Sequence, residues 1–410
     1  MNTTELSEKK WQAFTERLNE KGASGEAIAA SMRELYGMYS DELPVWLAGL
    51  YDHSIGGFYY SNSARDNTPF LPDIESTNQA LNLMINTGMI PSAKALPEAM
   101  QEKLKEFTCS LESPDDGYIY HPQWGKNIAD SRRARDLNWA LSMGDKLGFK
   151  LPYPTAIGRL KAWSRVEQKP TTLAEHLRSK DALLAYLGAL DWENNGYYSG
   201  NMIASQAPQI VAAGLADVCA EFLTEVQNKK TGFWSDKIDM RNGINSFLKT
   251  SAFFITAKRE IPSALTAAES ILSILTGDEV GSTVCHVYNV YSSLVNILSS
   301  LKRSGNEAGR AEVLAEIYRL APQAILGAKA KTEIFRKPDG AFSYMKDHSV
   351  HRSQEAPVSM PNSVESDVNA SVLCTSGLVN NICGALDITS DIPSIFDERH
   401  YALFLENLKL

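Results

Sequence analysis

Residues 50–81 read LYDHSIGGFYYSNSARDNTPFLPDIESTNQAL, and we expect this stretch to organise the fold. It lies between two apolar runs of helical character and is much longer than an ordinary connection of about four to six residues. Long connections in a globular domain often carry function. The pair Gly56-Gly57 permits backbone conformations and close approaches that a Cβ atom would prevent. The stretch therefore predicts a functional loop between two helices.

Weaker copies of this pattern, in which polar residues precede a glycine and one or two aromatic residues, recur along the chain. The copies read DDGYIYHP from Asp115, ENNGYYSGN from Glu193, KKTGFWSD from Lys229 and KPDGAFSY from Lys337. Any single copy is equally consistent with a simple turn whose aromatic side chain covers a helix end. Their recurrence favours a repeated structural unit.

The composition of the 410 residues is that of an ordinary globular protein, with 44% hydrophobic and 22% charged residues. A net charge of −9 argues against a nucleic-acid or anionic-membrane surface, so we expect neither as a partner. The N-terminus resembles no signal peptide, and no run of 18 apolar residues predicts a membrane span. The five cysteines are widely spaced and include no C-x-x-C pair, which favours reduced thiols, a cytoplasmic location and no structural zinc.

Hydrophobic periodicity predicts helices along almost the whole chain. Two helices are expected within residues 1–49, and further helices cover residues 76–87, 92–110, 137–146, 172–190, 210–222, 246–257, 263–275, 290–301, 311–326 and 368–386. Only YIYH and FSYM alternate like strands, and both lie in expected loops. The chain is therefore predicted to be all-α.

The expected helices are joined by alternating short and long connections. This pattern is typical of helical hairpins arranged in a ring, in which each hairpin buries one face against its neighbours. We predict an α,α-toroid, a barrel of helical hairpins, formed by residues 1–410 as a single large domain with residues 1–49 at its periphery. The glycine steps at 57, 117, 196, 232 and 340 are uneven, so a strict solenoid is not expected.

Two of these segments carry a family resemblance. LYDHSIGGFYY resembles the Asp-x-x-x-Gly-Gly-Phe turn of the N-acylglucosamine 2-epimerase-like six-hairpin proteins, and KPDGAFSYM with ESDVNAS resembles the Gly-Phe repeat of terpenoid cyclases and protein prenyltransferase subunits. Each match covers about ten residues and implies an α,α-toroid fold rather than an activity.

The chain departs from the terpenoid families at the residues that perform their chemistry. A protonating cyclase would need an Asp-x-Asp-Asp run, and SPDDGY has a different spacing. The zinc set of a prenyltransferase would need an Asp beside Cys285 and His286, and the sequence places none there. We therefore expect no metal and no cofactor.

Four loop clusters carry the side chains that could perform chemistry. The candidate catalytic residues are His286, Tyr288, His121, Asp52 and His53. The candidate substrate-binding residues are Tyr59, Tyr60, Arg65, Trp124, Arg132, Arg135, Tyr197, Asn201, Trp234, Arg241, Asn289, Tyr344, Glu365 and Asp367.

Each cluster also has an interpretation without function. Residues 132–136 could be a solvated charge run at a helix start, and His121 could be a packed loop histidine. His286 could cap a helix or belong to the core. Glu365 and Asp367 could serve only as helix caps.

Taken together, the loops combine aromatic faces with arginines, histidines, amides and carboxylates. This combination suits a sugar, and arginine adds bidentate recognition of a carboxylate or sulfate. We expect an enzyme whose substrate is a small molecule or an oligosaccharide, possible reactions being those of a lyase, a hydrolase or an epimerase. A terpenoid cyclase or prenyltransferase relative and a non-catalytic toroid that binds a glycan or peptide are the alternatives. Among the candidates, His286 is expected to transfer a proton while Asn289 orients the substrate.

Overall fold

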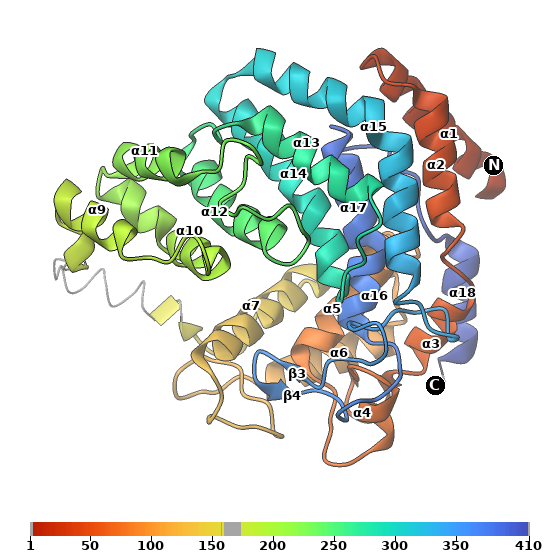
Figure 1. Cartoon of the computed structure of the whole chain (residues 1–410). Coiled ribbons are helices and arrows are strands. Elements are labelled where there is room, and N and C mark those ends of the chain that lie inside the picture. The colour runs from red at the N-terminus through yellow and green to blue at the C-terminus, as the bar shows by residue number, and fades with distance from the viewer. Residues whose placement is uncertain (1–2, 157, 160–173, 409–410) are drawn as a thin grey trace.

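The computed structural model describes residues 3–156, 158–159 and 174–408, and helices dominate it (Figure 1). The prediction of an all-α chain is confirmed. The helices of the first half are α1 (Thr3–Glu20), α2 (Gly25–Tyr36), α3 (Glu42–Ala48), α4 (Asn62–Asp66), α5 (Ile74–Asn86), α6 (Glu98–Ser110), α7 (Asp130–Leu147), α9 (Lys180–Gly188) and α10 (Gly196–Ala212). Those of the second half are α11 (Ala216–Val226), α12 (Gly243–Ala257), α13 (Ala264–Thr276), α14 (Val284–Ser304), α15 (Glu307–Glu333), α16 (Val368–Val372), α17 (Leu378–Ala385) and α18 (Glu398–Asn407).

Short elements complete the described chain. Single 3₁₀ turns are η1 (Ala93–Ala95) and η2 (Glu175–Leu177), and the π-helical turn η3 (Leu373–Gly377) joins α16 to α17. Two antiparallel hairpins are formed by β1 (Tyr51–Asp52) with β2 (Gly57–Phe58), and by β3 (Arg352–Ser353) with β4 (Ala356–Pro357). No described helix is both long enough and apolar enough to cross a membrane.

Several predicted boundaries are wrong for identifiable reasons. The helix expected at 137–146 begins at Asp130, because the charged run that precedes it is itself helical. The helix expected at 210–222 is two helices, since Gly214 adopts a φ of +72° between α10 and α11. Of the helix expected at 172–190, residues 172–173 lie outside the described residues, and the remainder forms η2 and α9.

Six helical segments, α10, α12, α14, α16–α17, α5 and α7, form a series in which each packs beside the next. We call them the inner series. Other helices cover its outside: α13 and α15 pack on α14, α6 packs on α7, and α2 packs on α15 (Figure 1).

Neighbours of the inner series run in the same direction. Near their N-termini, Asn289 of α14 donates to Asn245 of α12 across 2.9 Å, and farther along both helices Asn296 donates to Ser251 across 2.9 Å. Gln79 and Asn369 make the corresponding contact between α5 and α16 at 3.1 Å. The N-terminal ends of these neighbouring helices therefore lie at one end of the molecule, together with the loops that precede them.

The Gly-aromatic turns occupy those loops in four of the five predicted copies. Their glycines adopt the left-handed conformation, with φ of +84° at Gly56, +71° at Gly117, +71° at Gly232 and +77° at Gly340. A Cβ on Gly232 would lie 2.5 Å from the backbone nitrogen of Ala267 in α13, so the turn packs backbone to backbone on a neighbouring helix. The fifth copy is an incorrect prediction, because Gly196 is the first residue of α10.

The aromatic residues that follow these glycines belong mainly to the core. Phe58, Phe233 and Phe342 are fully buried, while Tyr118 is partly exposed. The turns thus fix the long loops to the helix ends by apolar burial, and the polar parts of the loops remain free to form a site.

Candidate functional site

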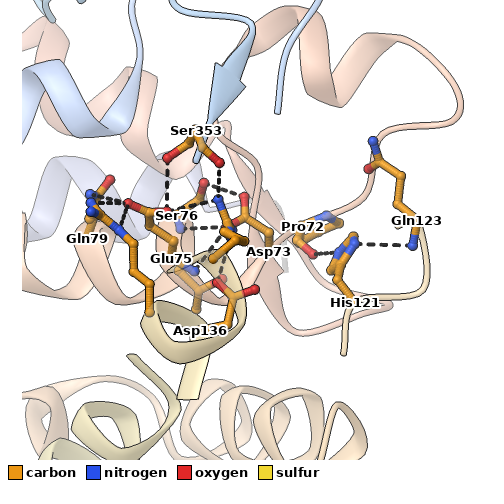
Figure 2. A network of polar contacts seen from close by, with 12 residues as sticks. Pro72, Asp73, Glu75, Ser76, Gln79, His121, Gln123, Asp136 and Ser353 are labelled. Atoms are coloured by element: carbon orange, nitrogen blue, oxygen red, sulfur yellow. Dashed lines mark hydrogen bonds and ion pairs between the residues drawn. The ribbon is translucent and has the colours of Figure 1, made fainter. Parts of the chain in front are cut away.

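The N-terminal ends of α5 and α7 meet beneath the β3–β4 hairpin in a network of buried charges (Figure 2). Asp73 caps α5, and its Oδ1 accepts hydrogen bonds from the backbone N–H groups of Glu75 at 3.0 Å and Ser76 at 3.1 Å. This capping places Glu75 in the first turn of α5. The sequence Asp-x-Glu before an apolar helical run therefore builds two carboxylates into one helix start.

Arg132 lies at the centre of the network and its side chain has no exposed surface. Its Nη2 donates to Asp73 Oδ1 at 3.0 Å, and its Nη1 lies 2.9 Å from Glu75 Oε2. Its Nε is 2.8 Å from Asp136 Oδ1, an ion pair whose angles do not meet hydrogen-bond geometry. The alternative reading of residues 132–136 as a solvated charge run is wrong for Arg132 and for Asp136, which is also buried.

Glu75 connects Arg132 to a second arginine one turn farther along α7. Its Oε1 accepts from Arg135 Nε at 2.8 Å and lies 2.6 Å from Arg135 Nη2. Its Oε2 also accepts from the hydroxyl of Ser353 at 3.1 Å. Both oxygens are occupied, so Glu75 acts here as an anchor for two guanidinium groups.

The charges of this network do not balance when every group is ionised. Three carboxylates, those of Asp73, Glu75 and Asp136, face two guanidinium groups. Burial raises the pKa of Asp136 to about 7; the positive charge of Arg132 opposes this shift and the other two carboxylates reinforce it. Protonation of Asp136 brings the network to electrical neutrality.

Arg135 is the charged group of this network that reaches solvent, with 37% of its side chain exposed. Its guanidinium lies 5.7 Å from the ring centre of Trp139. Glu75 and Trp139 therefore hold the group in one orientation, near the positive end of the α7 dipole. A guanidinium held in this way retains donors for an external anion.

Cys285 and Tyr344 contact each other, and the positive charge of Arg135 acts on Cys285. The Cys285 sulfur is 3.1 Å from the Tyr344 hydroxyl. Burial raises the pKa of the Cys285 thiol, and the positive charge of Arg135 partly opposes that shift. Burial likewise raises the pKa of Tyr344 far above its usual value, with contributions from Cys285, Asp367 and Tyr197. Tyr344 is therefore a neutral proton donor at physiological pH.

Asp367 caps α16 as Asp73 caps α5. Its Oδ1 accepts from Ala370 N–H and its Oδ2 from Tyr344 N–H, both at 2.7 Å. Burial raises its pKa to about 7 although these bonds oppose the shift. The hydroxyl of buried Tyr60 lies beside it without good hydrogen-bond geometry. Asp367 thus caps α16 with Oδ1 and orients the Tyr344 backbone with Oδ2, so both of its oxygens are occupied.

His121 lies beside the network, next to Pro72 and Gln123 (Figure 2). His121 is buried, its Nε2 lies 2.8 Å from the carbonyl oxygen of Pro72, and its Nδ1 accepts from Gln123 N–H at 3.2 Å. Its ring stacks on Trp124 with centroids 4.0 Å apart, and Arg132 lies 5.0 Å from the same indole ring. Both ring nitrogens of His121 are occupied, which indicates a role in positioning Trp124.

Glu365 ties the first long loop to the last one. Its Oε1 accepts from Ser61 at 2.9 Å, Ser63 at 2.6 Å and Ser349 at 3.0 Å, and its Oε2 accepts from Ser63 N–H at 2.6 Å. The carboxylate is thereby committed to holding these loops together.

The catalytic candidates of the first loop are engaged within that loop. Asp52 accepts from the backbone of Ser54 and Ile55 and from the Tyr59 hydroxyl at 2.9 Å. His53 packs edge-on against Tyr51. Arg65 is ion-paired with its neighbour Asp66 and donates to the Gly49 carbonyl. Within the described residues, no hydrogen bond or ion pair joins these side chains to the Arg132 network.

His286 lies in the first turn of α14, where the sequence predicts a helix start. It is buried, and its Nδ1 accepts from Ser282 N–H at 3.1 Å. Burial lowers its pKa, and the charge of nearby Arg241 adds to this. Asn289 pairs with Asn245 on the inner series, while the Tyr288 ring packs near Gly377.

The candidates of the middle loops differ in exposure. Trp234 is buried, donates its indole N–H to the Leu223 carbonyl at 2.8 Å and packs on Phe247, so it presents no face to a substrate. Tyr197 is 49% exposed, with Lys249 above its ring at 5.7 Å, and Asn201 is exposed one turn farther along α10.

The structure adds residues that were not among the candidates. They are Asp73, Glu75, Gln79, Asp136, Trp139, Cys285, Ser353 and Asn369. The signal for Asp73 and Glu75 is their position at a helix start. Arg132, Arg135 and Asp136 share a helix face through their i, i+3 and i+4 spacing, which becomes visible once the helix is extended to residue 130.

Groups of three or more potential metal ligands are absent from the described residues, and all five cysteines are free. Comparisons with protein-family models, with curated proteins and with solved structures gave no match to this chain.

Proposed function

We propose that the protein is an α,α-toroid enzyme that acts on an anionic carbohydrate at the Arg135 end of the inner series. The toroid is supported by the parallel inner series, by the helices packed outside it and by the repeated left-handed glycine turn. The family resemblance of the first and last loops supports the same architecture.

The proposal depends on the fixed orientation and partial exposure of the Arg135 guanidinium group. Its guanidinium is oriented by Glu75 and Trp139, is 37% exposed and lies at the N-terminal end of α7. Preorganised guanidinium groups of this kind favour carboxylates and sulfates over neutral hydroxyls. A uronic or sulfated sugar supplies such an anion.

The surroundings of Arg135 suit the remainder of a sugar. Trp139, Tyr344 and Tyr197 supply aromatic faces, and Gln79 and Asn369 supply amides. An isoprenoid would favour an apolar wall, which argues against the terpenoid alternative.

Tyr344 is the side chain best suited to transfer a proton at this site, because burial keeps its phenol protonated while its hydroxyl lies beside Cys285. Arg135 would neutralise a substrate carboxylate and so acidify the adjacent C–H bond; a water molecule would take that proton, and Tyr344 would donate its own proton to the carbanion or to the leaving oxygen. Lyase and epimerase reactions use this chemistry, whereas hydrolysis would need two free carboxylates. The carboxylates of Glu75, Glu365 and Asp367 are all occupied, which makes hydrolysis the weaker candidate.

The test is a binding comparison between uronic oligosaccharides and their neutral counterparts by isothermal titration calorimetry. We expect the wild type to bind the anionic members and Arg135→Met to bind them at least about tenfold more weakly, as expected for loss of a charged hydrogen bond. Arg133→Met is the matched control, because Arg133 is on the same helix and pairs with exposed Asp130. Equal affinity for neutral sugars, or unchanged binding by Arg135→Met, would overturn the proposal. Binding without turnover would instead favour the non-catalytic toroid.

A further inference from the structure

A cavity lies at the end of the inner series opposite the Arg135 site. Its volume is about 520 Å³, and it lies between the α1–α2 turn, the first three turns of α15 and the residue that follows the C-cap of α17. The residues around it are Lys21, Gly22, Ala23, Ser24, Arg310, Ala311, Leu314, Ala315, Tyr318, Arg319 and Asp387.

Two cations of this cavity share one carboxylate. Lys21 Nζ lies 2.7 Å from Asp387 Oδ2, and Arg310 Nη2 lies 2.6 Å from Asp387 Oδ1. Burial would raise the pKa of Asp387, but the hydrogen bonds from Lys21 and Arg310 outweigh it and lower that pKa. Asp387 is therefore a carboxylate at neutral pH, and the three groups carry a net charge of +1.

Two further acidic groups, Glu316 and Glu307, lie near these cations. Glu316 forms a bidentate pair with Arg319 and so neutralises a different cation. Glu307 is 70% exposed and lies 3.8 Å from Arg310, at the outer limit of an ion pair. The Arg310 Nε atom is buried and has no hydrogen-bond partner among the described residues. The positive charge of Lys21 and Arg310 thus exceeds what Asp387 compensates.

The cavity has a polar wall at the start of α2 and an apolar wall on α15. The start of α2 borders it, where Ser24 makes no side-chain capping hydrogen bond and the N–H group of Gly25 donates to Asn19 Oδ1 at 2.9 Å. The anion-binding side of the cavity is therefore the pair of cations Lys21 and Arg310. On the opposite wall Ala311, Leu314 and Ala315 present apolar surface from α15. The cavity therefore combines an anion-binding side with an apolar side.

We propose that this cavity binds a small molecule that carries a phosphate or carboxylate group on a short carbon skeleton. Lys21 and Arg310 bind the anionic group, and the apolar face of α15 contacts the skeleton. Asp387 occupies the position of the anion in the free protein and holds the two cations in place for it. This site does not depend on the proposed carbohydrate activity.

The experiment measures binding of inorganic phosphate and of a phosphorylated hexose by calorimetry, with chloride at equal ionic strength as the reference. We expect saturable binding that is tighter for the phosphorylated hexose, because only the hexose phosphate reaches the apolar wall. Lys21→Gln should weaken the binding of both phosphate compounds at least about fivefold, in line with loss of one charged contact. Arg17→Gln removes a cation from the last turn of α1, four residues before Lys21; Arg17 is paired with Asp391 outside the cavity, and its replacement should leave binding unchanged.

Asp387→Asn provides the sharper test. Asp387 has a φ of +57°, a conformation that asparagine also adopts readily, so the turn can be retained. Removal of the competing negative charge should tighten anion binding about tenfold or more. A role confined to folding would give no such gain, and circular dichroism verifies that the variant is folded. Non-saturable binding, or equal binding by wild type and Lys21→Gln, would show an adventitious ion only and would overturn the proposal.

Discussion

The Nη1 atom of Arg132 donates a hydrogen bond to the carbonyl oxygen of Ser353 across 3.0 Å, although 221 positions separate the two residues in the chain. This bond joins the buried charges of α5 and α7 to the β3–β4 hairpin that covers them. A small apolar cluster of Tyr60, Ala356 and Val358 supports the same hairpin. The network is therefore both the floor of the proposed site and an attachment point for the loop above it.

Replacement of Arg132 should destabilise the protein strongly. Arg132→Met leaves Asp73 and Glu75 buried with less compensating charge, and loss of one partner from a buried ion pair typically costs about 3–5 kcal/mol. Urea unfolding followed by circular dichroism measures the change. Arg133→Met, which removes an ion pair with the 90% exposed side chain of Asp130, should change the free energy of unfolding by less than about 1 kcal/mol. Similar losses in both variants would contradict the central position of Arg132.

Asp136 should make the stability depend on pH in a defined window. The unfolded pKa of aspartate is about 3.9, and the folded pKa of Asp136 is about 7, so the folded state binds the proton more tightly. The contribution of Asp136 to the free energy of unfolding is therefore largest below about pH 4 and is lost as the pH rises to about 7.

Asp136→Asn removes this titration and resembles the protonated side chain. Urea unfolding should show that the variant gains stability relative to the wild type between pH 5 and about pH 8. Asp130→Asn, at a position with 90% exposed side chain, is the control and should show no comparable trend. A constant difference between Asp136→Asn and the wild type across this range would rule out the titration.

The left-handed glycine turns should tolerate no side chain where they meet a neighbouring helix. Gly232→Ala combines the cost of alanine at a φ of +71° with a Cβ placed 2.5 Å from Ala267 N, and we expect a loss of about 2–4 kcal/mol. Gly214→Ala is matched in φ, at +72°, but has no atom within 4 Å of the added Cβ. It should lose only about 1 kcal/mol in thermal or urea unfolding. Equal losses would show that the backbone conformation alone decides the cost.

Two measurements on the variant His286→Ala distinguish a catalytic role of His286 from a structural one. His286→Ala removes the acceptor of the Ser282 N–H group, which should cost about 1 kcal/mol of unfolding free energy. If His286 is the acid or base, turnover should also fall about a hundredfold or more once a substrate is identified. If it is structural, the rate per folded molecule should match the wild type. A fall in turnover per folded molecule therefore indicates a catalytic role, and a loss of unfolding free energy alone indicates a structural role.

Local sequence signals determined the helical class, most helix positions and four of the five Gly-aromatic turns, because periodicity and left-handed glycines depend on residues close together in the chain. They also identified Arg132 and Arg135 as polar candidates. The carbohydrate activity and the roles of its residues stay predictions.

Only the tertiary structure decided which candidates meet. Arg132 and Ser353 lie 221 positions apart, and Gln79 and Asn369 lie 290 apart, so no local pattern could pair them. Burial is also a tertiary property: it separates Arg132, which has no exposed side-chain surface, from Arg135, which reaches solvent three residues later on the same helix. The charges of both are visible in the sequence, but their different environments arise from helices and a hairpin that pack together only in the folded chain.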